Sequence, residues 1–235
     1  MGRLLRWTAG LLLLAAMGGA ATVGTGTVTI PPRYDPWAPL DIGETPNLLT
    51  RLKLSRLDGA PRQCHAVLGV AGLRFSPVTD RQTGEGCGLT DAVQVSRSAV
   101  AFNSGFTVTC PLAAPWMLFE THTLQPAARR HFGQPVTRVR HLGSYACRNV
   151  YGRAEGRRSE HATTNALDIA GFTLADGTTI ALPGDWTPSD GRKGAFLREI
   201  RDGACDVFRA VLGPDYNEAH RDHFHLDMGP YRVCR

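Results

Sequence analysis

The sequence predicts an α+β protein with a small antiparallel sheet, flanking helices, stabilising disulfide bonds and an N-terminal hydrophobic segment. Strand-like and helix-like patterns alternate along the chain, and Asp176-Gly177 joins two β-rich runs as in a hairpin. Six dispersed cysteines form an even set, as in disulfide-bonded exported domains. Hydrophobic residues make up 43% of the 235 residues and charged residues 20%, which is typical of globular chains and excludes an intrinsically disordered protein.

Residues 1–30 predict either a cleaved signal peptide or an uncleaved anchor in the inner membrane. Arg3 and Arg6 precede an uncharged apolar run, and residues 18–21 supply the small side chains of a cleavage site. The same run is long enough to span ~30 Å of hydrocarbon as a helix. Both alternatives place the rest of the chain in the periplasm or cell envelope, where disulfides form. The net charge of +5 comes without a basic run, so no nucleic-acid partner is expected.

The remaining chain divides into a tether and one domain. Residues 31–57 contain a proline-rich tether followed by a short helix, which the leucine spacing predicts at 48–57. Residues 58–235 form the domain, with a cysteine-rich part at 58–110 and a core part at 111–235. In the cysteine-rich part we expect short strands, such as 73–75 and 106–109, and no strong helix from Cys64 to Cys110 apart from a candidate turn at 64–70.

The core part alternates helical and strand patterns. In chain order these are a helix at 111–132 with a kink at Pro126, a strand at 136–145, a hairpin at 166–182, a helix at 196–212 and a strand at 223–228. Candidate disulfides join Cys205 to Cys234 and Cys110 to Cys147, although six cysteines allow many other pairings.

Two groups of histidines and carboxylates, at 159–168 and 220–227, are the candidate chemical site. In a strand, His223 and His225 share one face, because side chains alternate. On a single helix His161 and Asp168 would lie ~10 Å apart along the axis, so they can meet only if the chain folds back between them.

Two histidines and one carboxylate around an open position are the ligands of a catalytic zinc site. Such an ion polarises a carbonyl and lowers the pKa of water, which favours amide hydrolysis. The alternative is that these histidines are ordinary surface or core residues.

Four ordered blocks carry a resemblance to a known family. They are SYACRNV (144–150), SEHATTNALDIAGF (159–172), FLREIRDGACDVF (196–208) and HRDHFHLD (220–227). From about residue 31 to its end, the chain resembles the bacterial extensin-like C-terminal domain family. That family is in turn similar to the LAS zinc peptidases, which include D-alanyl-D-alanine carboxypeptidases and murein endopeptidases and share the signature SxHxxGxAxD followed by HxH or ExxH. The resemblance implies the LAS/hedgehog-type peptidase fold.

The resemblance also assigns roles to residues of this chain. It implies three Zn²⁺ ligands: His161, Asp168 and His225. It leaves two alternatives for the catalytic base, since strand alternation favours His223 and the carboxylate-type members favour Asp222.

Three further residues match the family's pattern around the metal. Arg148 corresponds to the arginine that steadies the substrate, and His220 and Ser159 correspond to residues beside the ligands. One departure stands in the metal loop, where Thr164 replaces the glycine of the signature.

The implied function is an exported zinc-dependent metallopeptidase that acts on peptidoglycan or its stem peptides. The alternative is a non-catalytic binding module of the cell envelope that retains the peptidase fold. A catalytic base near the metal distinguishes the two, and this chain has both candidates for it.

Overall fold

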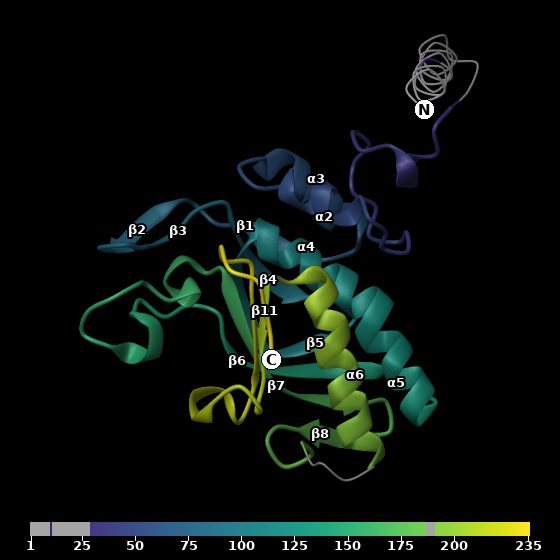
Figure 1. The fold of residues 1–235 in the computed structure, drawn as a ribbon, viewed down its shortest axis with the longest axis vertical. Helices are drawn as coiled ribbons and strands as arrows, with labels where there is room; N and C mark the ends of the chain where they lie inside the picture. The colour runs from purple at the N-terminus through teal and green to yellow at the C-terminus, as the bar shows by residue number, and fades with distance from the viewer. Residues whose placement is uncertain (1–9, 11–28, 187–190) are drawn as a thin grey trace, which may run out of the picture. The chain divides into compact units, whose positions relative to one another are not determined.

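A mixed β-sheet with helices packed against it organises Pro39–Arg235 in the computed structural model (Figure 1). The structure describes residues 10, 29–186 and 191–235, and its chain divides into two units, Met1–Ala38 and Pro39–Arg235. The described part of the first unit contains one short 3₁₀ helix, η1 (Pro32–Tyr34). The predicted signal or anchor lies almost wholly outside the described residues; among those described, no helix has the length and apolarity needed to cross a membrane.

The strands lie in one large sheet and one separate hairpin. The large sheet contains Arg74–Pro77 (β1), Ala92–Arg97 (β4), Ala101–Thr109 (β5), Val136–Gly143 (β6), Ala166–Leu174 (β7), Thr179–Ala181 (β8), Ala210–Leu212 (β9), Phe224–Asp227 (β10) and Val233–Cys234 (β11). Its order is β1-β4-β5-β6-β7-β10-β9-β11, with β8 paired to β7. The separate hairpin pairs Arg81–Gly84 (β2) with Cys87–Leu89 (β3).

The prediction of a small antiparallel sheet is wrong about the size of the sheet and about the direction of some of its strand pairs. The described sheet has nine strands, and the pairs β5–β6 and β9–β11 are parallel. A parallel pair needs a crossover, because the chain must return to the same end of the sheet. The helical run at 110–132 supplies it between β5 and β6.

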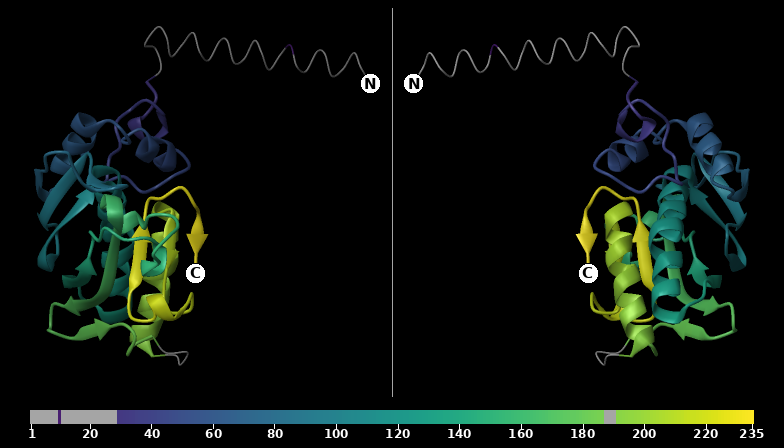
Figure 2. Two further views of the ribbon diagram at one scale, coloured as in Figure 1. Left: turned by 90° about the vertical axis from the view of Figure 1, so that its left-hand side faces the viewer. Right: turned by 90° about the vertical axis from the view of Figure 1, so that its right-hand side faces the viewer.

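The helices are α2 (Thr50–Ser55), α3 (Pro61–Val70), α4 (Cys110–Phe119), α5 (Gln125–Phe132) and α6 (Arg192–Val207). A π-helical turn, η2 (Glu120–Leu124), joins α4 to α5, and three 3₁₀ helices are η3 (Val150–Gly152), η4 (Glu160–Thr163) and η5 (Glu218–His220). Helices α5 and α6 run side by side in Figure 1 and in the right-hand view of Figure 2. Their contact includes Phe132 and Phe196, whose ring centroids are 5.5 Å apart.

The core forms between these helices and one face of the sheet. Phe196 and Ile200 of α6 are completely buried, and Phe196 packs edge-on against Phe172 of β7 at 5.7 Å between ring centroids. Leu40 and Ile42, within the predicted tether, also belong to this core, so that part of the segment packs on the domain.

Two helix predictions differ from the structure. The helix expected at 196–212 ends at Val207, and residues 210–212 form β9 instead, because the edge of β10 offers them backbone partners. Where the sequence indicated only a turn at 64–70, the structure has the ten-residue α3, which begins at Pro61 and buries Cys64, Val67 and Leu68. The Asp176-Gly177 hairpin is confirmed by the antiparallel pairing of β7 and β8.

Three disulfides connect the six cysteines: Cys64–Cys110, Cys87–Cys147 and Cys205–Cys234. The Cys205–Cys234 pairing is confirmed. The Cys110–Cys147 pairing is wrong, because α3 packs on α4 and brings Cys64 to Cys110, while β3 lies near the loop that contains Cys147.

Candidate metal centre

The three predicted ligands meet at one point. His161 Nε2 is 3.1 Å from His225 Nδ1, and the two carboxylate oxygens of Asp168 each face one of these histidines. Asp168 Oδ1 lies 3.0 Å from His225 Nδ1, and Oδ2 lies 3.2 Å from His161 Nε2. Among the described residues this is a grouping of histidine and carboxylate groups that could hold a metal ion.

The chain folds back between His161 and Asp168 as their separation required. Ser159 begins η4, and its hydroxyl accepts a hydrogen bond from the His161 backbone N–H at 3.3 Å. Thr164 then takes a left-handed conformation (φ 55°) that ends η4 and turns the chain into β7. Asp168 lies on β7 opposite His225 of β10, so sheet pairing completes the cluster.

In each histidine, one ring nitrogen faces away from the other two residues of the cluster: Nδ1 in His161 and Nε2 in His225. The partners of these outer nitrogens can only accept hydrogen bonds. His161 Nδ1 lies 3.3 Å from the backbone oxygen of Ser144, and His225 Nε2 lies 2.9 Å from Asp227 Oδ2. Each outer nitrogen therefore carries a proton and donates it. Metal-binding histidines are held in this way by carbonyl or carboxylate groups.

A positive charge is needed where His161 Nε2, His225 Nδ1 and the Asp168 carboxylate meet. With their outer nitrogens protonated, neutral His161 and His225 direct lone pairs at each other and at the carboxylate of Asp168. Three electron-rich atoms at this separation repel one another unless a proton or a metal ion lies between them.

In the protein without a metal ion, a proton on His225 supplies this positive charge. Burial lowers the pKa of His225, but hydrogen bonds and charges of Asp168 and Asp227 outweigh it and raise the pKa to about 9. Burial raises the pKa of Asp168, but His161 and His225 hold it well below its usual range. The cluster therefore stabilises positive charge at its centre.

The donor set and its spacing fit zinc. Tetrahedral ligands about 2.0–2.1 Å from an ion lie about 3.3 Å from one another, close to the spacings of this cluster. Structural zinc sites commonly use cysteines, whereas all six cysteines here are in disulfides. Three protein ligands match a site that keeps one position open.

The two candidate bases, His223 and Asp222, form a pair. His223 Nδ1 lies 2.8 Å from Asp222 Oδ1, and His223 Nε2 lies 3.6 Å from Asp168 Oδ1. The hydrogen bond to His223 lowers the pKa of the half-exposed Asp222 carboxyl. His223 lines the pocket next to the cluster, and Asp222 lies on the other side of its ring.

His220 extends the histidine group without joining the ligands. Its ring centroid is 5.7 Å from that of His225 and 5.4 Å from that of His223, and its Nδ1 is 2.7 Å from Asn217 Oδ1. Burial, and then the neighbouring histidine charges, lower its pKa to about 4. His220 is therefore a neutral imidazole at neutral pH.

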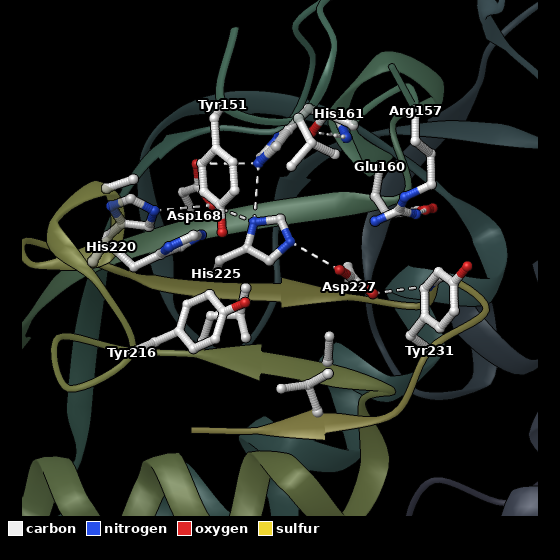
Figure 3. A pocket seen from close by; sticks show the side chains of 18 of the residues that line it. Tyr151, Arg157, Glu160, His161, Asp168, Tyr216, His220, His225, Asp227 and Tyr231 are labelled. Carbon is white, nitrogen blue, oxygen red and sulfur yellow. Dashed lines mark hydrogen bonds and ion pairs between the residues drawn. The ribbon is translucent and has the colours of Figure 1, made fainter. Parts of the chain in front are cut away.

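These residues lie in a pocket of about 460 Å³ (Figure 3). Tyr151, Tyr216 and His220 lie on one side of the cluster, and Arg157, Glu160 and Tyr231 lie on the other. Arg148 and Ser159 also line the pocket. The pocket therefore extends on both sides of the cluster, as an elongated ligand would require.

Asp227 is a buried carboxylate of the candidate site to which the sequence analysis assigned no role. It is 7% exposed, it holds the outer nitrogen of His225, and its Oδ1 accepts the Gly229 N–H at 2.8 Å. The alternation that groups His223 with His225 extends to Asp227, so the signal was present in the sequence.

The fold and the site together define a disulfide-braced α+β domain with a His₂Asp cluster in a pocket. The chain belongs to the extensin-like C-terminal family, since the family model for the extensin-like protein C-terminus matches residues 62–235. No curated protein and no solved structure matches this chain.

Proposed function

We propose that this protein is an exported zinc-dependent peptidase that hydrolyses amide bonds in peptidoglycan cross-links or stem peptides. The observation that carries the proposal is the convergence of two histidine nitrogens and one carboxylate, each histidine held from outside, within a pocket. The similarity of the extensin-like sequence blocks to the LAS zinc peptidases supports the same chemistry and the LAS-type fold.

His161, Asp168 and His225 would hold the zinc ion. When bound, zinc supplies Lewis-acid polarisation of a carbonyl and lowers the pKa of water. Ser144 and Asp227 keep the two imidazoles in the tautomer that directs a lone pair at the ion.

His223 is the better candidate for the base. Asp222 occupies its Nδ1 side, which leaves Nε2 facing the pocket as the atom that accepts a proton from water. Asp222 then acts as a positioning residue that stabilises the protonated imidazole, a role that reconciles the two alternatives. Arg148 supplies positive charge for the substrate carbonyl as negative charge develops there.

The compartment belongs to the same proposal. Three disulfides stabilise a protein in the oxidising periplasm or cell envelope and not in a reducing cytosol. Peptidoglycan is the amide-containing polymer of that compartment, and the net charge of +5 suits an anionic wall.

The test combines metal analysis with digestion of purified muropeptides. We expect about one zinc per wild-type chain and cleavage that a chelator abolishes; His161→Ala should lose both. The matched control is His131→Ala, because His131 lies on α5 and pairs with Glu199 away from the pocket. Zinc-free wild-type protein would contradict the proposal, and zinc with tight muropeptide binding but no cleavage would favour a binding module.

A further inference from the structure

A second pocket, of about 320 Å³, lies beside the first. It is formed by α2, the end of α6 and the segment after β10, and it is lined by Arg51, Leu54, Ser55, Val207, Phe208, Arg209, Met228, Pro230, Tyr231 and Arg232. Pro230 and Tyr231 also line the metal pocket. These two residues therefore form a shared wall between the two pockets.

The second pocket combines an apolar floor with a positive rim. Leu54, Val207 and Phe208 are each less than one-tenth exposed. Three exposed arginines come from separate parts of the chain: Arg51 from α2, Arg209 from just before β9 and Arg232 from just before β11. The lining residues include no carboxylate to neutralise them.

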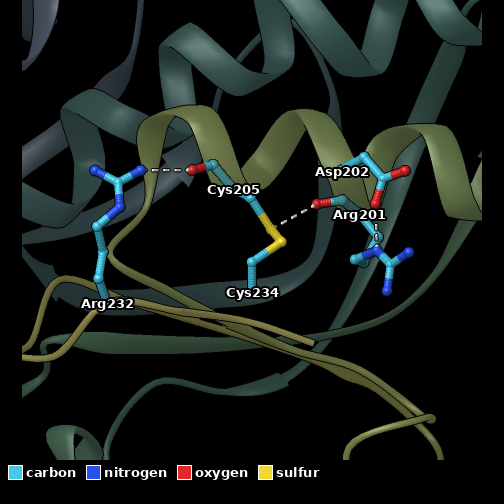
Figure 4. The surroundings of a disulfide bond; sticks show 5 residues. All are labelled: Arg201, Asp202, Cys205, Arg232 and Cys234. Atoms are coloured by element: carbon cyan, nitrogen blue, oxygen red, sulfur yellow. Dashed lines mark hydrogen bonds and ion pairs between the residues drawn. A yellow bond between two sulfur atoms is a disulfide. The ribbon is translucent and has the colours of Figure 1, made fainter.

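Two of the arginines are held in place by the last turn of α6. Arg51 Nε donates to the backbone oxygen of Asp206 at 3.2 Å, and Arg232 donates to that of Cys205 at 3.2 Å (Figure 4). The Cys205–Cys234 disulfide attaches the same turn to β11. Each of these bonds uses one N–H of a guanidinium group that has five, so the remaining donors are available to a ligand.

We propose that this pocket binds a carboxylate of the same wall peptide that enters the metal pocket. The inference deepens the proposed function and rests on it. Guanidinium groups bind carboxylates through paired, charge-assisted hydrogen bonds, and the apolar floor suits the short aliphatic side chain next to such a carboxylate. The shared wall favours one elongated ligand over two separate ones, because Tyr231 borders both pockets and is 62% exposed.

The experiment compares two peptides and three forms of the full chain by calorimetry. The probes are a stem peptide with free carboxylates and the same peptide with those carboxylates amidated. The variant carries Arg51→Gln, Arg209→Gln and Arg232→Gln. The matched control carries Arg62→Gln, Arg74→Gln and Arg97→Gln, which remove the same charge from exposed arginines that are not in the linings of either pocket.

We expect the free carboxylates to strengthen binding to wild type and control by about ten- to a hundred-fold, and this preference to disappear in the pocket variant. The proposal would be overturned if the pocket variant preferred the free-carboxylate peptide over the amidated one as strongly as the wild type does. It would also be overturned if the wild type bound the two peptides equally or bound neither.

Two further arms separate this carboxylate site from the metal centre and from a membrane contact. His161→Ala should lose zinc and cleavage but keep the preference for free carboxylates. A wild type that keeps this preference but binds no zinc and cleaves neither peptide would leave the carboxylate site standing while the peptidase proposal fails. Loss of binding to phosphatidylglycerol vesicles in the pocket variant, with unchanged peptide binding, would overturn the peptide assignment in favour of a membrane contact.

Discussion

Asp227 decides which nitrogen of His225 faces the cluster. Its carboxylate holds the protonated Nε2 at 2.9 Å, so Nδ1 directs its lone pair at His161 and Asp168. Replacing a carboxylate by an amide at such a position removes both the charge and the pure acceptor that fixes the tautomer.

Asp227→Asn is therefore expected to weaken zinc binding by about 10–100-fold while the fold is retained. A competition titration against a chromophoric chelator measures the affinity. Asp202→Asn on the exposed side of α6 is the control and should bind zinc as the wild type does. An unchanged affinity in Asp227→Asn would argue that Asp227 does not orient His225.

The raised pKa of His225 makes the stability of the chelator-treated protein depend on pH. Its folded-state pKa is about 9, above the unfolded value of about 6.5, because the hydrogen bonds with Asp168 and Asp227 outweigh burial. The protonated group therefore stabilises the fold fully below about pH 6.5, and this contribution is lost as the pH rises through 9.

We expect the melting temperature of chelator-treated protein to fall between pH 7 and 9.5, and to fall less in His225→Gln. Thermal unfolding followed by circular dichroism measures both. An equal decline in the two proteins would assign the pH dependence to other groups.

At the scale of elements, the loop that ends η4 stores backbone strain. Thr164 is a β-branched, fully buried residue at φ 55°, where glycine is favoured. Its backbone oxygen accepts the Thr109 N–H at 2.9 Å, and the turn lets Asp168 reach the cluster. Thr164 thus makes a left-handed turn that glycine would make without strain.

Two substitutions at this position separate backbone strain from side-chain packing. Both Thr164→Ala and Thr164→Gly remove the buried hydroxyl, but only glycine relieves the left-handed strain. We expect the glycine variant to be about 1 kcal/mol more stable than the alanine variant in urea unfolding. A more stable alanine variant would mean that the strain is negligible.

At the scale of the whole molecule, the Cys87–Cys147 disulfide ties the β2–β3 hairpin to the loop that carries Arg148. The same loop supplies the Ser144 carbonyl to His161, and its Arg148 carbonyl accepts the Ser159 N–H at 3.0 Å. The Cys64–Cys110 disulfide joins α3 to α4 and does not involve this loop. Its cysteines are 46 positions apart in the sequence, and those of Cys87–Cys147 are 60 apart, so the two disulfides close loops of similar length.

Removing either disulfide by paired alanine substitutions is expected to cost about 4 kcal/mol of unfolding free energy. Only the loss of Cys87–Cys147 should also lower peptide turnover, because it frees Arg148. Urea unfolding and muropeptide cleavage at a temperature where both variants are folded measure these effects. Equal turnover in the two variants would show that the disulfide does not position the arginine.

Local patterns in the sequence determined much of this molecule. The hairpin at Asp176-Gly177, the strand that presents His225, and the two histidine and carboxylate groups at 159–168 and 220–227 follow from turn chemistry, alternation and residue type, which act over a few neighbouring positions. The choice of His161, Asp168 and His225 from these groups came from the family resemblance, and the structure brings these three together.

Only the tertiary structure decided the sheet's parallel pairs, the partner of Cys147 and the strand at 210–212. Each depends on which distant segment comes to lie alongside, and such long-range contacts leave little periodic trace in the local sequence. Tertiary structure alone also decided the contact of His161 Nδ1 with the Ser144 carbonyl and the arginine-lined pocket beside the pocket of the His161, Asp168 and His225 cluster. The residues of both come together only through packing.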